Sequence, residues 1–252
     1  MRLIHPARPR RFSGRAAMAM MMLIVGSAAL ALMMLGRAGH IAPTALLALS
    51  AALGLGVGST MGVRAFLDGR RRTEEQGHDL ARLLAPVFDH QYLLILSPRL
   101  PGVPDDLAAL LVGPPGVRAV VARRWHGRYR VHGRGWEFDT GSRAGWMPCL
   151  TNPSFDADAA TTAVARWARE AGVEPALPIA PLVIFPRGYS KIVLEEPEGE
   201  VVTIDNAPWW AQRIGRVQRM DAPRLARFVD AVLLAAERPA ESHVGAATVR
   251  TA

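Results

Sequence analysis

Two long uncharged runs of apolar residues near the start of the chain constrain its fold more than any other feature. The first covers residues 16–35 and the second residues 41–63, which makes them 20 and 23 residues long. At a rise of ~1.5 Å per residue, a helix of either length crosses a hydrocarbon core roughly 30 Å thick. We therefore expect two transmembrane helices followed by a separate folded domain.

The arginines predict how these spans are oriented. Residues 1–72 contain ten arginines and one acid, whereas residues 73–252 contain 20 basic and 21 acidic side chains. The basic residues flank the pair of runs, in a basic N-terminus (residues 1–15) and a basic linker (residues 64–72), and one arginine, Arg37, lies between the runs. The positive-inside rule then places both termini and the soluble domain in the cytoplasm, on a multi-pass protein of the cell membrane.

A secretory signal within residues 1–40 is the alternative, since Arg10-Arg11-Phe12 loosely resembles a twin-arginine leader. Its apolar run is longer than the roughly 7–15 residues usual for such signals, and it has no clean cleavage site between small residues. The second run, followed by arginines, would still stop transfer. We favour a helical hairpin, with glycine, alanine and serine in both runs allowing close packing.

Composition narrows the chemistry of the soluble part. The net charge of +8 would by itself suggest nucleic acid as a partner, but the excess belongs to the N-terminal 72 residues. The single cysteine, Cys149, excludes an intrachain disulfide and a cysteine-rich zinc site. The histidines lack metal-binding spacing, and no dinucleotide or P-loop fingerprint occurs, so we expect neither a metal nor a cofactor.

Hydrophobic periodicity predicts one α/β domain over residues 73–237 and a disordered tail over residues 238–252. We expect a helix over 73–88, largely antiparallel strands over 92–96, 107–112, 117–122 and 127–138, and a loop over 141–153. A helix over 155–171 follows, capped by Asn152 and ended by Gly172. Further strands are expected over 179–185, 192–194 and 201–204, and a last helix over 221–236.

The two strands that flank Gly113-Pro114-Pro115-Gly116 have the frame of a metal-dependent nuclease core of the D…ExK kind. In such a core, carboxylates on both strands bind Mg²⁺ and a lysine polarises the attacking water. With the surrounding motifs, this frame resembles the nuclease-related domain (NERD) family over about residues 77–186. The motifs are Leu100-Pro101-Gly102, Gly113 to Val117, Trp125-His126-Gly127, Trp136, Trp146, Asn152-Pro153 and Val183 to Pro186.

The resemblance implies a restriction-endonuclease-like mixed sheet flanked by helices, but every catalytic position of the family carries another residue here. These positions fall on His78, Ala108, Val121, Arg123 and Asp156. Arg123 retains a positive charge, but a guanidinium has no acceptor and does not act as a base. We therefore expect a catalytically inactive domain that serves as a binding or scaffolding module.

An active membrane-tethered nuclease acting on DNA is the alternative. Asp105 and Asp106 precede Ala108 by three and two residues, so a strand shift or a β-bulge would bring one carboxylate into place. A purely structural membrane protein without affinity for nucleic acid is a third class.

Arginines interleaved with aromatic residues form a candidate phosphate-binding region. Arg123, Arg124, Arg128 and Arg130 would contact phosphates while a neighbouring ring stacks on a base. We favour the simpler interpretation, a solvated strand face above buried tryptophans. The expected partners are the lipid bilayer, with its anionic inner leaflet, and either nucleic acid or an unidentified protein.

Overall fold

The computed structural model describes residues 1–4, 74–173, 177–217 and 219–237. Contacts divide the chain into two units, residues 1–7 with 75–252 and residues 8–74. The predicted spans, the linker and the tail lie outside the described residues, as do residues 5–15 of the N-terminus. No helix in the part that is described is long and apolar enough to cross a membrane.

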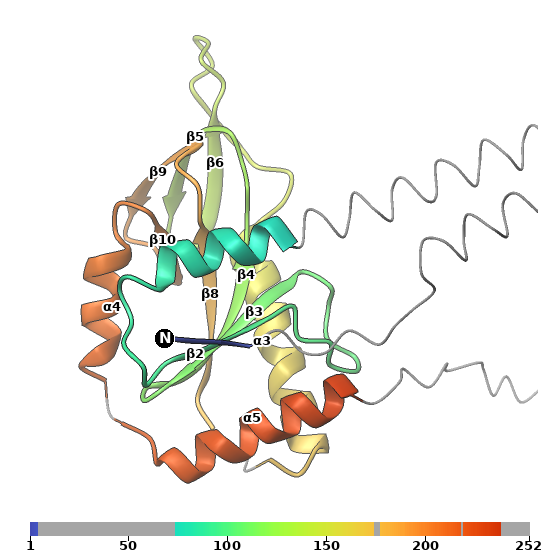
Figure 1. Cartoon of the computed structure of the whole chain (residues 1–252). Helices are drawn as coiled ribbons and strands as arrows, with labels where there is room; N and C mark the ends of the chain where they lie inside the picture. Colours follow the sequence, from blue (N-terminus) through green and yellow to red (C-terminus); the bar gives the residue numbers. More distant parts are fainter. Residues whose placement is uncertain (5–73, 174–176, 218, 238–252) are drawn as a thin grey trace, which may run out of the picture. The chain divides into compact units, whose positions relative to one another are not determined.

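The larger sheet has six strands in the order β1-β2-β3-β4-β8-β10 (Figure 1). Its members are β1 (Arg2–Ile4), β2 (Leu93–Leu96), β3 (Leu107–Gly113), β4 (Gly116–Ala122), β8 (Ile179–Phe185) and β10 (Glu200–Thr203). The β2–β3 and β3–β4 pairs are antiparallel, whereas β1 runs parallel to β2, and β4, β8 and β10 run parallel to one another. The sheet is therefore mixed.

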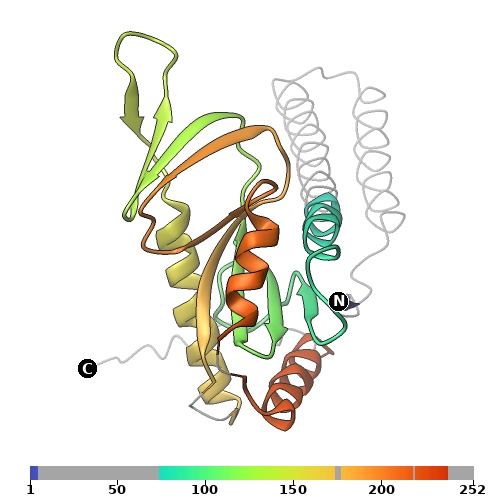
Figure 2. The same ribbon diagram turned by 90° about the vertical axis from the view of Figure 1, so that its left-hand side faces the viewer.

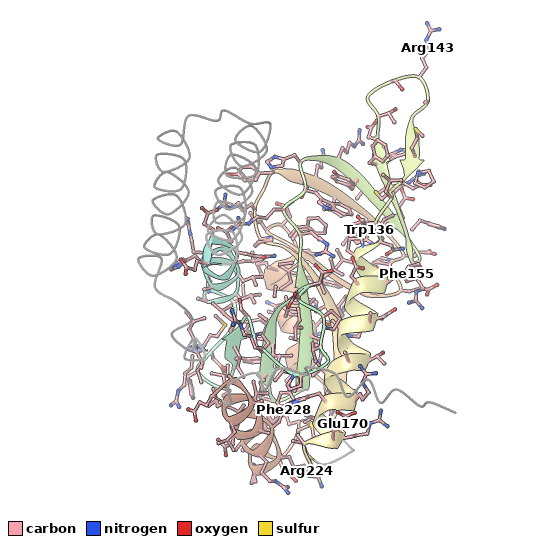
Figure 3. All side chains as sticks on the ribbon, turned by 90° about the vertical axis from the view of Figure 1, so that its right-hand side faces the viewer. Trp136, Arg143, Phe155, Glu170, Arg224 and Phe228 are labelled. Atoms are coloured by element: carbon pink, nitrogen blue, oxygen red, sulfur yellow. The ribbon has the colours of Figure 1, made fainter. Side chains whose placement is uncertain are left out.

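A second sheet of four strands has the order β7-β6-β5-β9. It contains β5 (Gly127–His132), β6 (Gly135–Asp139), β7 (Trp146–Pro148) and β9 (Ser190–Glu195). The aromatic rings of Trp125, Trp136 and Phe185 lie with their centroids 5.5 to 5.7 Å apart and join this sheet to the first. Figure 3 shows Arg143 at the tip of the β6–β7 hairpin, at the end of the domain opposite Arg224.

Helices cover both faces of the larger sheet (Figure 2). Helix α3 (Pro153–Glu170) and helix α5 (Ala222–Glu237) contribute Trp167 and Phe228 to one apolar cluster. The helix over residues 74–84 and helix α4 (Ala207–Gly215) contribute Leu80 and Trp210 to the other. Side chains of β4 alternate between the two clusters, with Val117, Ala119 and Val121 in the first and Val120 and Ala122 in the second. The domain is thus an α/β structure with a core on each side of a mixed sheet.

The first residues of the chain belong to this domain. The Arg2 N–H donates to the Tyr92 carbonyl at 2.8 Å, and the three residues of β1 pair in register with Leu93 to Ile95. Met1 packs against the second apolar cluster, and its ammonium group donates to the Phe88 carbonyl at 3.3 Å. A strand from the N-terminus therefore forms one edge of the larger sheet.

Several elements differ from the expectation. Residues 127–138 form two strands of a hairpin rather than one, because Gly133 takes a positive φ of 56° between them. The expected loop over 141–153 contains strand β7. The strands within residues 92–138 pair with one another in antiparallel fashion, as expected. The helix over 73–88 ends at residue 84, two residues before Pro86. Asn152 caps α3 as expected, accepting from the Ser154 and Phe155 N–H groups.

Candidate functional site

Three arginines gather where the parallel strands of the larger sheet end. Arg123 and Arg124 directly follow β4, and Arg187 lies two residues after β8. Because β4, β8 and β10 are parallel, their carboxyl ends share one edge of the sheet, which we call the carboxyl edge. Crevices at this edge hold the ligands of many α/β proteins, so these arginines define the candidate site.

Arg123 joins two carboxylates. Its Nη2 lies 2.5 Å from Asp156 Oδ2, in the first turn of α3, and its Nη1 lies 3.5 Å from Asp106 Oδ1, just before β3. The backbone N–H of Arg123 donates to the Ile184 carbonyl at 2.9 Å, which holds the residue beside β8. Asp156 also benefits from the positive end of the α3 dipole. A guanidinium therefore bonds both acids that would be available to a metal ion at this place.

The structure brings together only some of the positions that the family resemblance identified. Arg123 and Asp156 meet, and Asp106 joins them. The register of β3 shifts between Leu107 and Ala109, so Leu107 is the residue opposite Val121. The bulge leaves Ala108 packed on the second apolar cluster, whereas Val121 belongs to the first. His78 is exposed on the helix over residues 74–84.

The predicted bulge therefore exists, but it does not place a carboxylate opposite Val121. Both residues of that pair are buried and apolar, with exposed fractions of 4% for Leu107 and 0% for Val121. Neither supplies an oxygen ligand, and Mg²⁺ prefers oxygen ligands. In the part of the chain that the structure describes, no three His, Cys, Asp or Glu side chains are grouped so as to hold a metal ion.

A second charged cluster lies next to Arg123 and was not predicted. The buried carboxylate of Asp79 accepts from Arg124 Nη2 at 2.7 Å and from Arg187 Nε at 2.6 Å, through the same oxygen. Arg124 also bonds Glu75 at 3.1 Å, and the hydrogen bond to Asp79 raises the pKa of Arg187. The helix over residues 74–84 is thereby attached to the ends of β4 and β8. The sequence gives no periodic signal for pairs this far apart.

The outer face of the second sheet carries the other two predicted phosphate contacts. Arg128 and Arg130 lie two residues apart on β5, and their guanidinium carbons lie 5.4 and 4.9 Å from the centre of the Trp146 ring. Arg130 also bonds Glu137 on β6, and Arg128 lies 3.5 Å from Asp139. The alternation expected for β5 is confirmed, but acids of the same face partner both arginines, and both guanidinium groups lie near the ring.

Another arginine of the basic region is buried. Arg118 projects from β4 toward the second apolar cluster, where its Nε lies 3.0 Å from Glu200 Oε2 and its Nη2 lies 3.3 Å from Oε1. The indole N–H of Trp210 donates to the same Oε2 at 3.3 Å. This pair bridges β4 and β10, a contact that spacing along the sequence does not predict.

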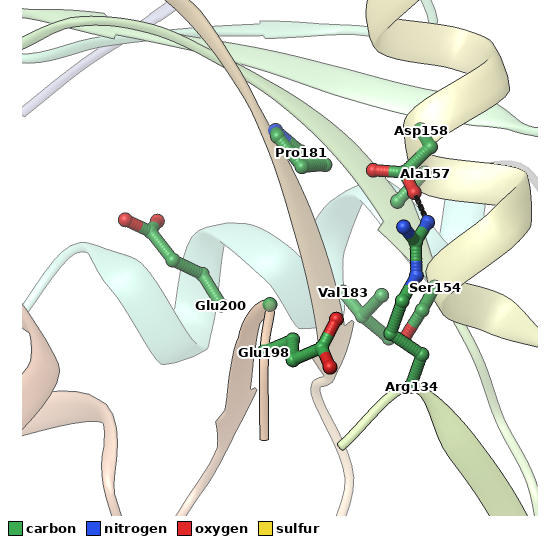
Figure 4. A pocket seen from close by; sticks show the side chains of 9 residues that line it. Arg134, Ser154, Ala157, Asp158, Pro181, Val183, Glu198 and Glu200 are labelled. Carbon is green, nitrogen blue, oxygen red and sulfur yellow. Dashed lines mark hydrogen bonds and ion pairs between the residues drawn. The ribbon is translucent and has the colours of Figure 1, made fainter. Parts of the chain in front are cut away.

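A small open pocket of about 110 Å³ lies near the start of α3, between Pro181 and Val183 of β8 and Glu198 of the β9–β10 turn (Figure 4). Arg134 lines it but points toward Asp158, with which it forms an ion pair. Asp158 and Glu198 supply two carboxylates to its lining, whereas the carboxylate of Glu200 bonds Arg118. The carboxylates outnumber the one arginine, so the pocket is not suited to an anion.

No protein-family model, curated protein or solved structure matches the chain significantly.

Proposed function

We propose that this protein is anchored in the membrane and displays a catalytically inactive nuclease-related domain as a binding or scaffolding module. The observation that carries the proposal is the bonding of Arg123 to both Asp156 and Asp106. A carboxylate held by a guanidinium is a poor ligand for Mg²⁺, because the cation must displace a charge-assisted hydrogen bond. Arg123 also lacks a lone pair with which to activate water.

The pairing of β1 with β2 supports the proposed arrangement at the membrane. Residues 2–4 and residues 93–96 form adjacent strands, so the two ends of the segment over residues 5–73 return to one domain. Any membrane crossing within that segment then occurs an even number of times. This agrees with a hairpin whose two ends share the cytoplasm, whereas a cleaved leader over residues 1–40 would remove β1.

An active nuclease is the second candidate, and one observation favours it. Asp106 and Asp156 both lie within reach of one guanidinium, so movement of Arg123 would free two carboxylates at the end of β4. The apolar pair of Leu107 and Val121 weighs against this candidate, since a D…ExK site draws its oxygen ligands from these strands.

The ion pairs of the outer sheet face favour a protein over nucleic acid as the partner. Phosphate binding by Arg128 or Arg130 would break existing pairs with Asp139 and Glu137, and the binding energy would fall accordingly. The predicted stacking ring, Trp146, already has both guanidinium groups nearby.

Binding and topology are tested on the full chain. In detergent micelles it is titrated with labelled single- and double-stranded DNA at two salt concentrations. We expect no salt-sensitive binding, and tight binding weakened by Arg128→Gln would show that a nucleic-acid surface exists.

For topology, epitope tags in the β6–β7 hairpin and at the C-terminus are probed with protease on sealed inverted and right-side-out vesicles. We expect both tags to be cleaved only in inverted vesicles.

Intact mass of the protein extracted from membranes separates the hairpin from the cleaved leader. We expect a species that retains residues 1–4. A species that begins near residue 40, or a protein released from membranes by alkaline carbonate, would contradict the proposed anchor.

A further inference from the structure

Three large side chains are exposed around the carboxyl edge. Tyr189 lies between β8 and β9, Ile204 directly follows β10, and Trp209 is in the first turn of α4, with exposed fractions of 52%, 48% and 61%. We call these three residues the hydrophobic edge. They come from segments that follow β8 and β10, whose carboxyl ends are adjacent in the larger sheet.

Contacts join part of this set into one surface. The Tyr189 ring stacks on His126 with centroids 4.9 Å apart, and a Cβ built on Gly188 would lie 3.7 Å from Ile204 Cδ1. Arg187 lies 5.6 Å from the Tyr189 ring, and Arg213 lies 5.0 Å from the Trp209 ring. Aromatic side chains with adjacent arginines are typical of segments at the boundary between lipid and water.

The chain enters the domain at the same edge. Glu75, in the first turn of the first described helix, bonds Arg124. Asp79, in the middle of that helix, bonds Arg187, which in turn lies against Tyr189. Residues 64–73 separate this helix from the second apolar run, and ten residues reach at most roughly 35 Å even when extended. Four of them are arginines, which are attracted to anionic headgroups.

We infer that the hydrophobic edge rests on the headgroup region of the bilayer that anchors this chain. This inference rests on the proposed membrane anchor and adds an orientation, with the carboxyl edge toward lipid and α5 away from it. The side chain of Asp205, next to Ile204, is exposed and opposes contact with an anionic surface, so the apolar side chains supply the specific contact. The arginine-rich linker supplies attraction without fixing the orientation.

Leu234 provides a matched control. It is 57% exposed on α5, and Met220 just before that helix donates to the Pro114 carbonyl in the β3–β4 turn, at the amino end of β4. It therefore has nearly the exposure of Trp209 but lies at the opposite edge of the sheet. Cys149→Ser gives a cysteine-free background, because Cys149 is the single cysteine.

The experiment uses the full chain reconstituted in phosphatidylcholine vesicles with and without phosphatidylglycerol. A fluorophore is attached to Ile204→Cys, Trp209→Cys or Leu234→Cys, and quenching by lipids that carry a headgroup nitroxide is measured. We expect at least threefold stronger quenching at residues 204 and 209 than at residue 234. Because two independent positions report on the edge, failure of one variant to fold leaves the other decisive.

The outcomes separate the two proposals. Equal quenching at all three positions, in protein that resists carbonate extraction, would overturn the lipid-facing edge and leave the anchor intact. Carbonate-extractable protein would overturn the anchor, and the orientation with it. Protection of residues 204 and 209 that depends on protein concentration rather than on lipid would identify a second copy of the chain as the occupant and contradict the inference.

Discussion

The buried pair of Arg118 and Glu200 allows a quantitative test of the fold. The side chains are 8% and 21% exposed, and two hydrogen bonds of 3.0 and 3.3 Å join them. Removing one partner of a buried pair typically costs about 3–5 kcal/mol, because the remaining charge stays in a poorly hydrated place. For Glu200→Gln we expect a loss near the lower end, about 3 kcal/mol, since the site is partly hydrated and the new amide still accepts one hydrogen bond.

The assay is urea unfolding of the full chain in detergent micelles, followed by tryptophan fluorescence. All six tryptophans lie between residues 125 and 210, so the signal reports on the α/β domain. Glu198→Gln is the matched control in the same acidic turn, and its exposed side chain predicts a change within about 0.5 kcal/mol. Arg118→Met combined with Glu200→Gln should cost less than the sum of the single changes. Equal effects of Glu200→Gln and Glu198→Gln would refute the reasoning.

Three further predictions concern the turn, the N-terminal strand and the thiol. Gly116→Ala should lower the free energy of unfolding in urea by more than about 3 kcal/mol, because φ is +105° and the new Cβ would lie 2.5 Å from the Pro178 carbonyl oxygen. The control Gly141→Ala, at φ +65° with open space around the new Cβ, should lower it by about 1 kcal/mol. Equal losses for the two variants would contradict this prediction. Arg2→Pro should lower the free energy of unfolding by about 1 kcal/mol relative to Arg2→Ala, since only proline removes the N–H that donates to the Tyr92 carbonyl. No difference between the two variants would show that β1 is not paired. Burial, and to a smaller extent the charge of Glu137, raise the pKa of the Cys149 thiol above its ordinary value of 9.0. Alkylation by iodoacetamide should therefore keep accelerating above pH 9, and it should be faster in Glu137→Gln. An alkylation rate that levels off below pH 9 would be the contrary result.

Much of the domain was predictable because its signals are local. The apolar run over residues 179–185 matches β8, and the Gly113 to Gly116 turn joins β3 and β4 as expected. The two glycines of that turn are required for different reasons. Gly116 takes a positive φ, whereas a Cβ on Gly113 would overlap the ring of Tyr92, which lies just before β2, and no local pattern reveals this contact.

The elements that were missed depend on distant contacts. Three residues at the N-terminus are too few for periodicity to identify β1, and they are fixed by pairing with residues some 90 positions away. Strand β7 is equally short, and α4 has only nine residues. Within α4, the Trp210 ring is buried and the Trp209 ring is exposed.

The candidate site was predictable in its residue types but not in its pairing. The family resemblance pointed to Arg123 and Asp156, which do meet, and a strand shift or a bulge near Ala108 was considered as a way to recruit Asp105 or Asp106. That Asp106 would bond Arg123 does not follow from spacing, since 17 residues separate them. The cluster of Asp79, Arg124 and Arg187 joins residues up to 108 positions apart and depends on the parallel pairing of β4 and β8.

The most direct test of the account is cleavage of supercoiled plasmid DNA by the full chain in detergent micelles, with Mg²⁺ and with Mn²⁺. Arg123→Lys is measured alongside, because it restores the amine of the D…ExK pattern while Val121 remains apolar. The account predicts no cleavage by either protein. Metal-dependent cleavage by the wild type that is lost in Asp106→Ala and in Asp156→Ala would contradict it and establish an active nuclease.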